Sequence, residues 1–179
     1  MNVASRRRPG LRLVGVFAAV FTTLQYGMLK SEGTAVERLL IDRATVSVAA
    51  AFADRVFPDD QVRANGHVLV SSRVRLNVLR GCEGTDLLFL VIAGVVAFPA
   101  SWRSRLLALA GGIALAYGVN QLRILALYYT IRDARQHFEL MHAYLAPTAA
   151  IVVIALFFWS WTARNRLASP AVNAAIAEP

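Results

Sequence analysis

Three side chains of the types that perform thiol acyl transfer lie far apart in the sequence: Cys82, Arg123 and His142. A thiolate attacks a carbonyl carbon, an imidazole moves protons, and a guanidinium stabilises a thiolate or an oxyanion. Cys82 is the only cysteine in 179 residues, which excludes an intramolecular disulfide and a cysteine-cluster metal site. We therefore predict a catalytic set of these three residues, with no metal and no cofactor. Cys82 also precedes an apolar helix, whose positive N-terminal end would lower the pKa of the thiol.

Four further residues are candidates for substrate-binding or supporting roles. Glu83 and Gly84 follow the cysteine directly, and a glycine there allows a substrate to approach the backbone closely. Asn120 and Tyr117 precede Arg123 by three and six residues, a spacing that places all three on one face of a helix. This polar stripe either faces a polar cavity or holds helices together.

Each candidate also has a non-catalytic interpretation. A lone cysteine beside an apolar run is often an inert small hydrophobe. An arginine within a span costs about 2.5–3.5 kcal/mol on insertion scales, so Arg123 is functional, paired, or snorkelling to the interface. His137, in a polar loop, is an alternative base. Glu83 and Asp86 are better explained as caps of the following helix than as proton donors.

The composition indicates a membrane protein. Hydrophobic residues make up 57% of the chain and charged residues only 17%, against about 25% in soluble domains. The net charge of +8 is concentrated in basic residues beside apolar runs, namely Arg6, Arg7, Arg8, Arg12, Arg103, Arg105, Arg164 and Arg166. Such clusters are typical of cytoplasmic anchors next to a lipid bilayer. Nucleic-acid binding would require basic residues interleaved with aromatic residues on one soluble face, and the sequence lacks that pattern.

Four apolar runs predict an all-α polytopic membrane protein with one domain over residues 1–179. The expected transmembrane helices cover 11–29, 85–101, 106–131 and 140–162, close to the roughly 20 residues that cross a bilayer. No small-residue cleavage pattern follows the first run, so we expect an uncleaved span. The arginines then place both termini in the cytoplasm, with a polar tail over 164–179.

The segment 30–84 differs from the spans and is expected on the extracytoplasmic side. Residues 34–57 have apolar positions at helical spacing and predict an amphipathic helix. Asn65-Gly66 predicts a type I′ turn in a hairpin over 62–70, and the alternation over 73–79 predicts a third strand. This topology brings Cys82, Arg123 and His142 to the same outer membrane face at similar depth.

At these residues the chain resembles the exosortase/archaeosortase family of membrane cysteine transpeptidases. The resemblance rests on Cys82-Glu83-Gly84, on Asn120-x-x-Arg123-Ile124, and on His142 at the start of a later span, and it covers roughly residues 60–163. The family often has glycine four residues after the histidine, where this chain has Ala146. The short chain is similar to compact subtypes such as the exosortase H type.

The resemblance implies an enzyme of the inner membrane that sorts exported proteins. Its substrates end in a short motif, a transmembrane helix and a basic cluster, and the enzyme cuts near the motif through a thioester. Cys82 would be the nucleophile, His142 the acid/base and Arg123 the charge stabiliser. A non-catalytic membrane assembly subunit is the alternative. A small transporter is disfavoured, because acidic residues and histidines are lacking deep inside the spans.

Overall fold

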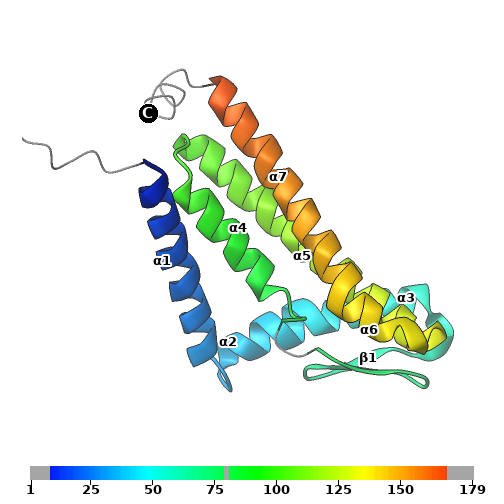
Figure 1. Ribbon diagram of the computed structural model, residues 1–179. Helices are drawn as coiled ribbons and strands as arrows, with labels where there is room; N and C mark the ends of the chain where they lie inside the picture. The colour runs from blue at the N-terminus through cyan, green and yellow to red at the C-terminus, as the bar shows by residue number, and fades with distance from the viewer. Residues whose placement is uncertain (1–8, 79–80, 169–179) are drawn as a thin grey trace, which may run out of the picture.

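The computed structural model describes residues 9–78 and 81–168 of the chain (Figure 1). Four apolar helices form a bundle: α1 (Pro9–Lys30), α4 (Thr85–Ala97), α5 (Trp102–Asp133) and α7 (Ala146–Ala168). The predicted Arg6–Arg8 cluster and the tail beyond residue 168 lie outside the described residues, whereas residues 164–168 continue α7.

Three stretches of the described chain are long and apolar enough to cross a membrane: Gly10–Lys30, Trp102–Asp133 and Arg135–Arg166. The last one begins with three short segments, η3 (Arg135–His137), α6 (Phe138–Leu140) and η4 (Met141–Leu145), and continues as α7. The remaining predicted span, over 85–101, contains a helix of 13 residues, α4. At about 1.5 Å per residue that helix is roughly 20 Å long, less than the roughly 30 Å hydrocarbon core.

Small residues let the bundle helices approach closely. A Cβ on Gly94 of α4 would lie 2.5 Å from the Phe158 ring of α7. On α5, a Cβ at Gly112 would lie 2.6 Å from Val91 and 3.0 Å from Phe157. Because lipid tails are as apolar as the helix faces, such close packing is a main source of helix association in membranes.

Residues 35–77 form a cap that covers one end of the bundle, away from the start of α1 and the end of α7 (Figure 1). The predicted amphipathic helix is present as α2 (Ala35–Glu37), the π-helix η1 (Arg38–Val46) and α3 (Ser47–Val56). Its apolar face is buried at Ile41, Val46, Ala49, Ala50 and Ala53, in one core with Ile124, Leu127 and Tyr128 of α5. The 3-10 turn η2 (Pro58–Asp60) follows and leads into the sheet.

The predicted hairpin and third strand are confirmed as a three-stranded antiparallel sheet. Its strands are β1 (Arg63–Asn65), β2 (Val68–Val70) and β3 (Arg75–Asn77), in that spatial order. The predicted type I′ turn is wrong. Asn65 pairs with Val68, so the loop is Gly66-His67, and only Gly66 has a positive φ. A positive φ at the first loop residue alone is the requirement of a type II′ turn.

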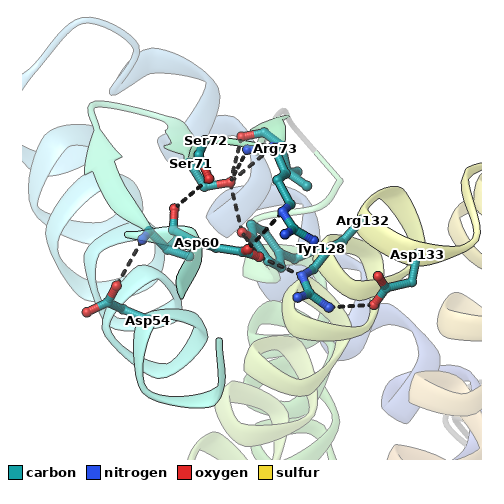
Figure 2. A network of polar contacts seen from close by, with 10 residues as sticks. Asp54, Asp60, Ser71, Ser72, Arg73, Tyr128, Arg132 and Asp133 are labelled. Carbon is teal, nitrogen blue, oxygen red and sulfur yellow. Dashed lines mark hydrogen bonds and ion pairs between the residues drawn. The ribbon is translucent and has the colours of Figure 1, made fainter. Parts of the chain in front are cut away.

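A buried carboxylate fastens the cap to α5 (Figure 2). The Asp60 side chain is fully buried and accepts hydrogen bonds from Arg132 Nε at 2.6 Å and from the Tyr128 hydroxyl at 3.1 Å. Arg73 Nε approaches the other carboxylate oxygen at 3.5 Å, and the Tyr128 hydroxyl also contacts Ser71 Oγ at 2.9 Å. The network therefore ties η2 and the turn before β3 to the last turns of α5. No local pattern in the sequence predicts this network.

Candidate active site

Cys82 lies in a short loop whose shape depends on two glycines. Gly81 and Gly84 have φ of +83° and +84°, the left-handed region that side chains strongly disfavour. Gly84 also meets α5 closely, because a Cβ there would lie 2.4 Å from Asn120 Cγ. The thiol between them is only 9% exposed and packs in the same core as the cap. The glycines thus permit a tight loop against α5 rather than an open one.

Two α5 side chains one turn apart bind the backbone on either side of Cys82. Asn120 Nδ2 donates to the Glu83 carbonyl at 2.9 Å, and Arg123 Nη1 donates to the Gly81 carbonyl at 2.7 Å. The second terminal nitrogen of Arg123, Nη2, lies 3.6 Å from Cys82 Sγ. The Asn-x-x-Arg spacing therefore fixes the loop on both flanks of the thiol while directing a cation at the sulfur.

His142 approaches the sulfur from the third long stretch. Its Nδ1 lies 3.6 Å from Cys82 Sγ, so the tautomer with hydrogen on Nε2 can accept the thiol proton. His142 is part of the π-helical turn η4, and single π turns inside helices frequently occur at functional sites. The Phe138 ring stacks on the imidazole with centroids 5.3 Å apart and planes 5° from parallel. This stacking restricts the orientation of the imidazole.

The remaining predicted residues take structural positions around this trio. Tyr117 does not reach the thiol; its hydroxyl donates to the Ala44 carbonyl in η1 at 2.5 Å. Glu83 is buried and accepts a hydrogen bond from Thr85 Oγ1 at 2.8 Å. The capping interpretation of Glu83 and Asp86 is wrong, since the N-cap of α4 is Gly84. Asp86 instead accepts a hydrogen bond from Gln25 of α1 at 2.6 Å.

His137, the alternative base, is exposed in η3, and no contact joins it to Cys82 in the part of the chain that the structure describes. Two contributors were not among the residues predicted from the sequence. Gln121 donates to the Thr45 carbonyl at 3.5 Å beside the Tyr117 contact, and Phe138 stacks on His142. The signal for Phe138 was its position one helical turn before the histidine.

The environment of the thiol keeps it protonated. Burial raises the pKa of Cys82 above the ordinary value for cysteine, the Arg123 charge opposes this, and the Glu83 charge adds to it. The net direction is the reverse of the lowering that we expected from the helix N-terminus, because loss of hydration outweighs the nearby positive charge. The thiol at rest therefore needs a base to become a nucleophile, and His142 is placed to accept its proton.

The reactivity of Cys82 should follow pH accordingly. A thiol with a raised pKa holds its proton to higher pH, so formation of a mixed disulfide with a small methanethiosulfonate, which releases methanesulfinate, should accelerate at higher pH than for free cysteine. Loss of the opposing charge in Arg123→Gln should move the midpoint further up, and Glu83→Gln should move it down. The measurement is the rate of this thiol modification against pH in detergent-solubilised protein. A midpoint in Arg123→Gln below that of the unaltered protein would contradict this electrostatic account.

In a comparison with protein families, the family model described as transmembrane exosortase (Exosortase_EpsH) matches residues 10–159. The matched range includes the loop of Cys82, the stripe of α5 and the π-helical turn with His142. No curated protein and no solved structure matches the chain.

Proposed function

The chain belongs to the transmembrane exosortase family, and from this premise we propose that it is a membrane-embedded cysteine transpeptidase. Its substrates are exported proteins that end in a sorting signal made of a short motif, one transmembrane helix and a basic cluster. The observation that carries the proposal is that Cys82 Sγ lies 3.6 Å from both His142 Nδ1 and Arg123 Nη2. A nucleophile, a base and a cation thus meet at one atom.

In the first half-reaction the thiol proton passes to His142 Nδ1 as the sulfur attacks the scissile carbonyl carbon. A C–S bond forms, and the carbonyl oxygen becomes an oxyanion that the Arg123 guanidinium stabilises. The C–N bond then breaks, and the imidazolium returns its proton to the leaving amine. The product is a thioester on Cys82 and a released C-terminal fragment.

In the second half-reaction an acceptor nucleophile attacks the thioester carbonyl. It gives its proton to His142 as the new bond to the carbonyl carbon forms. The C–S bond then breaks, and the imidazolium returns the proton to the departing thiolate, which restores the buried thiol of Cys82. An amine acceptor gives transfer, and water gives hydrolysis.

The same proposal places the cap and Cys82 on the extracytoplasmic side of the inner membrane. The opposite end of the bundle carries Arg103 and Arg105 in the first turn of α5, with Arg164 near the end of α7. A hydrogen bond from Ser104 to Asn165, 2.8 Å long, joins these two helix ends. The positive-inside rule puts such a basic end in the cytoplasm, together with both termini. In this arrangement α4 and the residues to 101 make a fourth crossing.

Trapping the thioester tests the chemistry directly. The full-length protein, co-expressed with an exported protein that ends in a sorting signal, should carry a hydroxylamine-sensitive adduct on Cys82. The measurement is mass spectrometry of the peptide that contains Cys82, after rapid acid quenching. Cys82→Ala provides the matched control, without an adduct. An adduct whose attachment site is another residue would contradict the proposal.

A further inference from the structure

A groove with a volume of about 460 Å³ lies along the sheet, and a second, smaller one of about 390 Å³ is lined in part by Gly81 and Glu83 of the Cys82 loop. One wall of this larger groove, the β3 groove, is strand β3 (Arg75–Asn77). The other wall comes from the end of α5 and from η3 and α6, through Ile131, Arg135, Gln136, Phe138 and Glu139. Its volume falls within the range of ligand pockets, about 300–1,000 Å³.

The wall formed by β3 is an edge of the sheet. Within residues 9–78 and 81–168, the sheet order β1-β2-β3 leaves β3 with one neighbouring strand. The Val78 amide donates to the His67 carbonyl at 2.8 Å, and Leu76 pairs with Leu69, so Leu76 and Val78 direct their backbone groups toward β2. Along an antiparallel strand, the residues that alternate with these two direct their backbone N–H and C=O groups away from the neighbouring strand. The N–H and C=O groups of Arg75 and Asn77 are therefore presented at the outer edge of the sheet.

Each wall of the β3 groove is connected to one of the candidate catalytic residues. Asn77 precedes Cys82 by five residues, and the intervening Val78 is buried in the same core as the thiol. Phe138, on the opposite wall, stacks on His142. A chain that lies in the groove is thus bordered by the strand that leads to the nucleophile and by the ring that orients the base.

We infer that the β3 groove binds the extended substrate segment beside the scissile bond, as an added strand on β3. The inference rests on the proposed function and adds to it the mode of peptide recognition. Alternating donors and acceptors at 75 and 77 match only an extended main chain, because a helix has its own backbone groups already paired. A strand of three residues spans about 10 Å, so about three substrate residues pair with it. The substrate helix lies elsewhere, against the apolar bundle.

Removing one outward amide tests the pairing. Asn77→Pro deletes an N–H that faces the groove, while the bonds of Leu76 and Val78 to β2 remain. Loss of a main-chain hydrogen bond and crowding by the ring should raise the KM for the protein substrate about tenfold, with kcat changed less. Ala64→Pro is the matched control. Ala64 is exposed at the same kind of outward position on β1, the opposite edge of the sheet, so KM should stay unchanged.

A crosslinking experiment keeps the inference testable if a proline variant folds poorly. A photoreactive benzoylphenylalanine at Gln136, an exposed residue of the β3 groove, should capture the substrate within a few residues of the cleavage site. The same group at Asn65, exposed on β1, should not. The background for both is Cys82→Ser, which retains uncleaved substrate. Capture from Gln136 of lipid alone, or of the substrate helix alone, would overturn the inference.

The two proposals fail in different ways. Processing that persists in Cys82→Ala would overturn the proposed function. Processing that requires Cys82, together with equal KM values for Asn77→Pro and Ala64→Pro and no crosslink at Gln136, would overturn only the groove assignment.

Discussion

Replacing Cys82 by alanine is expected to abolish processing of a co-expressed sorting substrate. Removal of the nucleophile from a hydrolytic triad lowers kcat by about 10⁶-fold, because the binding that remains cannot replace covalent catalysis. His142→Ala should lower the rate by about 10²–10⁴-fold, the usual contribution of a general base. The base is especially needed here, since burial keeps the thiol protonated. The measurement is the ratio of cleaved to full-length substrate on immunoblots, normalised to the amount of enzyme in the membrane.

The control for this prediction is the abundance and stability of the variant. Cys82 is small and lies at the edge of the cap core, so alanine should insert and fold normally. The assembly-subunit alternative predicts the opposite pattern. In that case Cys82→Ser has no effect on processing, while Arg123→Ala lowers abundance because the Gly81 carbonyl loses its partner. Full processing by Cys82→Ala would contradict the proposed enzyme and favour the assembly-subunit alternative.

Replacing Asp60 by alanine is expected to be the most destabilising substitution in the cap. The carboxylate is fully buried, and its removal leaves the Arg132 guanidinium and the Tyr128 hydroxyl without their shared acceptor. Breaking a buried ion pair by removing one partner costs about 3–5 kcal/mol. For a chain of this size that corresponds to a decrease in Tm of about 10 °C. The measurement is thermal unfolding in detergent, with Asp60→Asn expected to lose less because the amide oxygen still accepts.

Asp59→Ala is the matched control, because Asp59 belongs to the same turn η2 but is exposed. It should change stability by no more than about 0.5 kcal/mol. A Tm for Asp60→Ala equal to that of Asp59→Ala would mean that the network in Figure 2 does not fasten the cap to α5. Processing per folded molecule should change less in Asp60→Ala than in Cys82→Ala, because Asp60 does not contact the thiol.

The sequence determined much of the architecture because bilayer crossing and strand pairing leave strong local patterns. Apolar runs of the required length indicated the long helices, and period-two alternation indicated β3. The hairpin was recognisable from Asn65-Gly66, but its turn type was not. The turn type depends on which residues of β1 and β2 pair with each other. Pairing of Asn65 with Val68 makes Gly66 the first residue of the loop. The length of α4 was also overestimated, since composition does not show where a helix ends.

For the candidate site, the residue types and their order along the chain were enough to select Cys82, Arg123 and His142. Only the tertiary structure decided what each one touches. Long-range contacts place Arg123 on both the Gly81 carbonyl and the sulfur, and they turn Tyr117 away toward η1. They also bring His142, and not His137, to the sulfur among the described residues. The direction of the Cys82 pKa was likewise decided by burial. Hydration and distance are properties of the packed chain, and neither is encoded in the local spacing of residues.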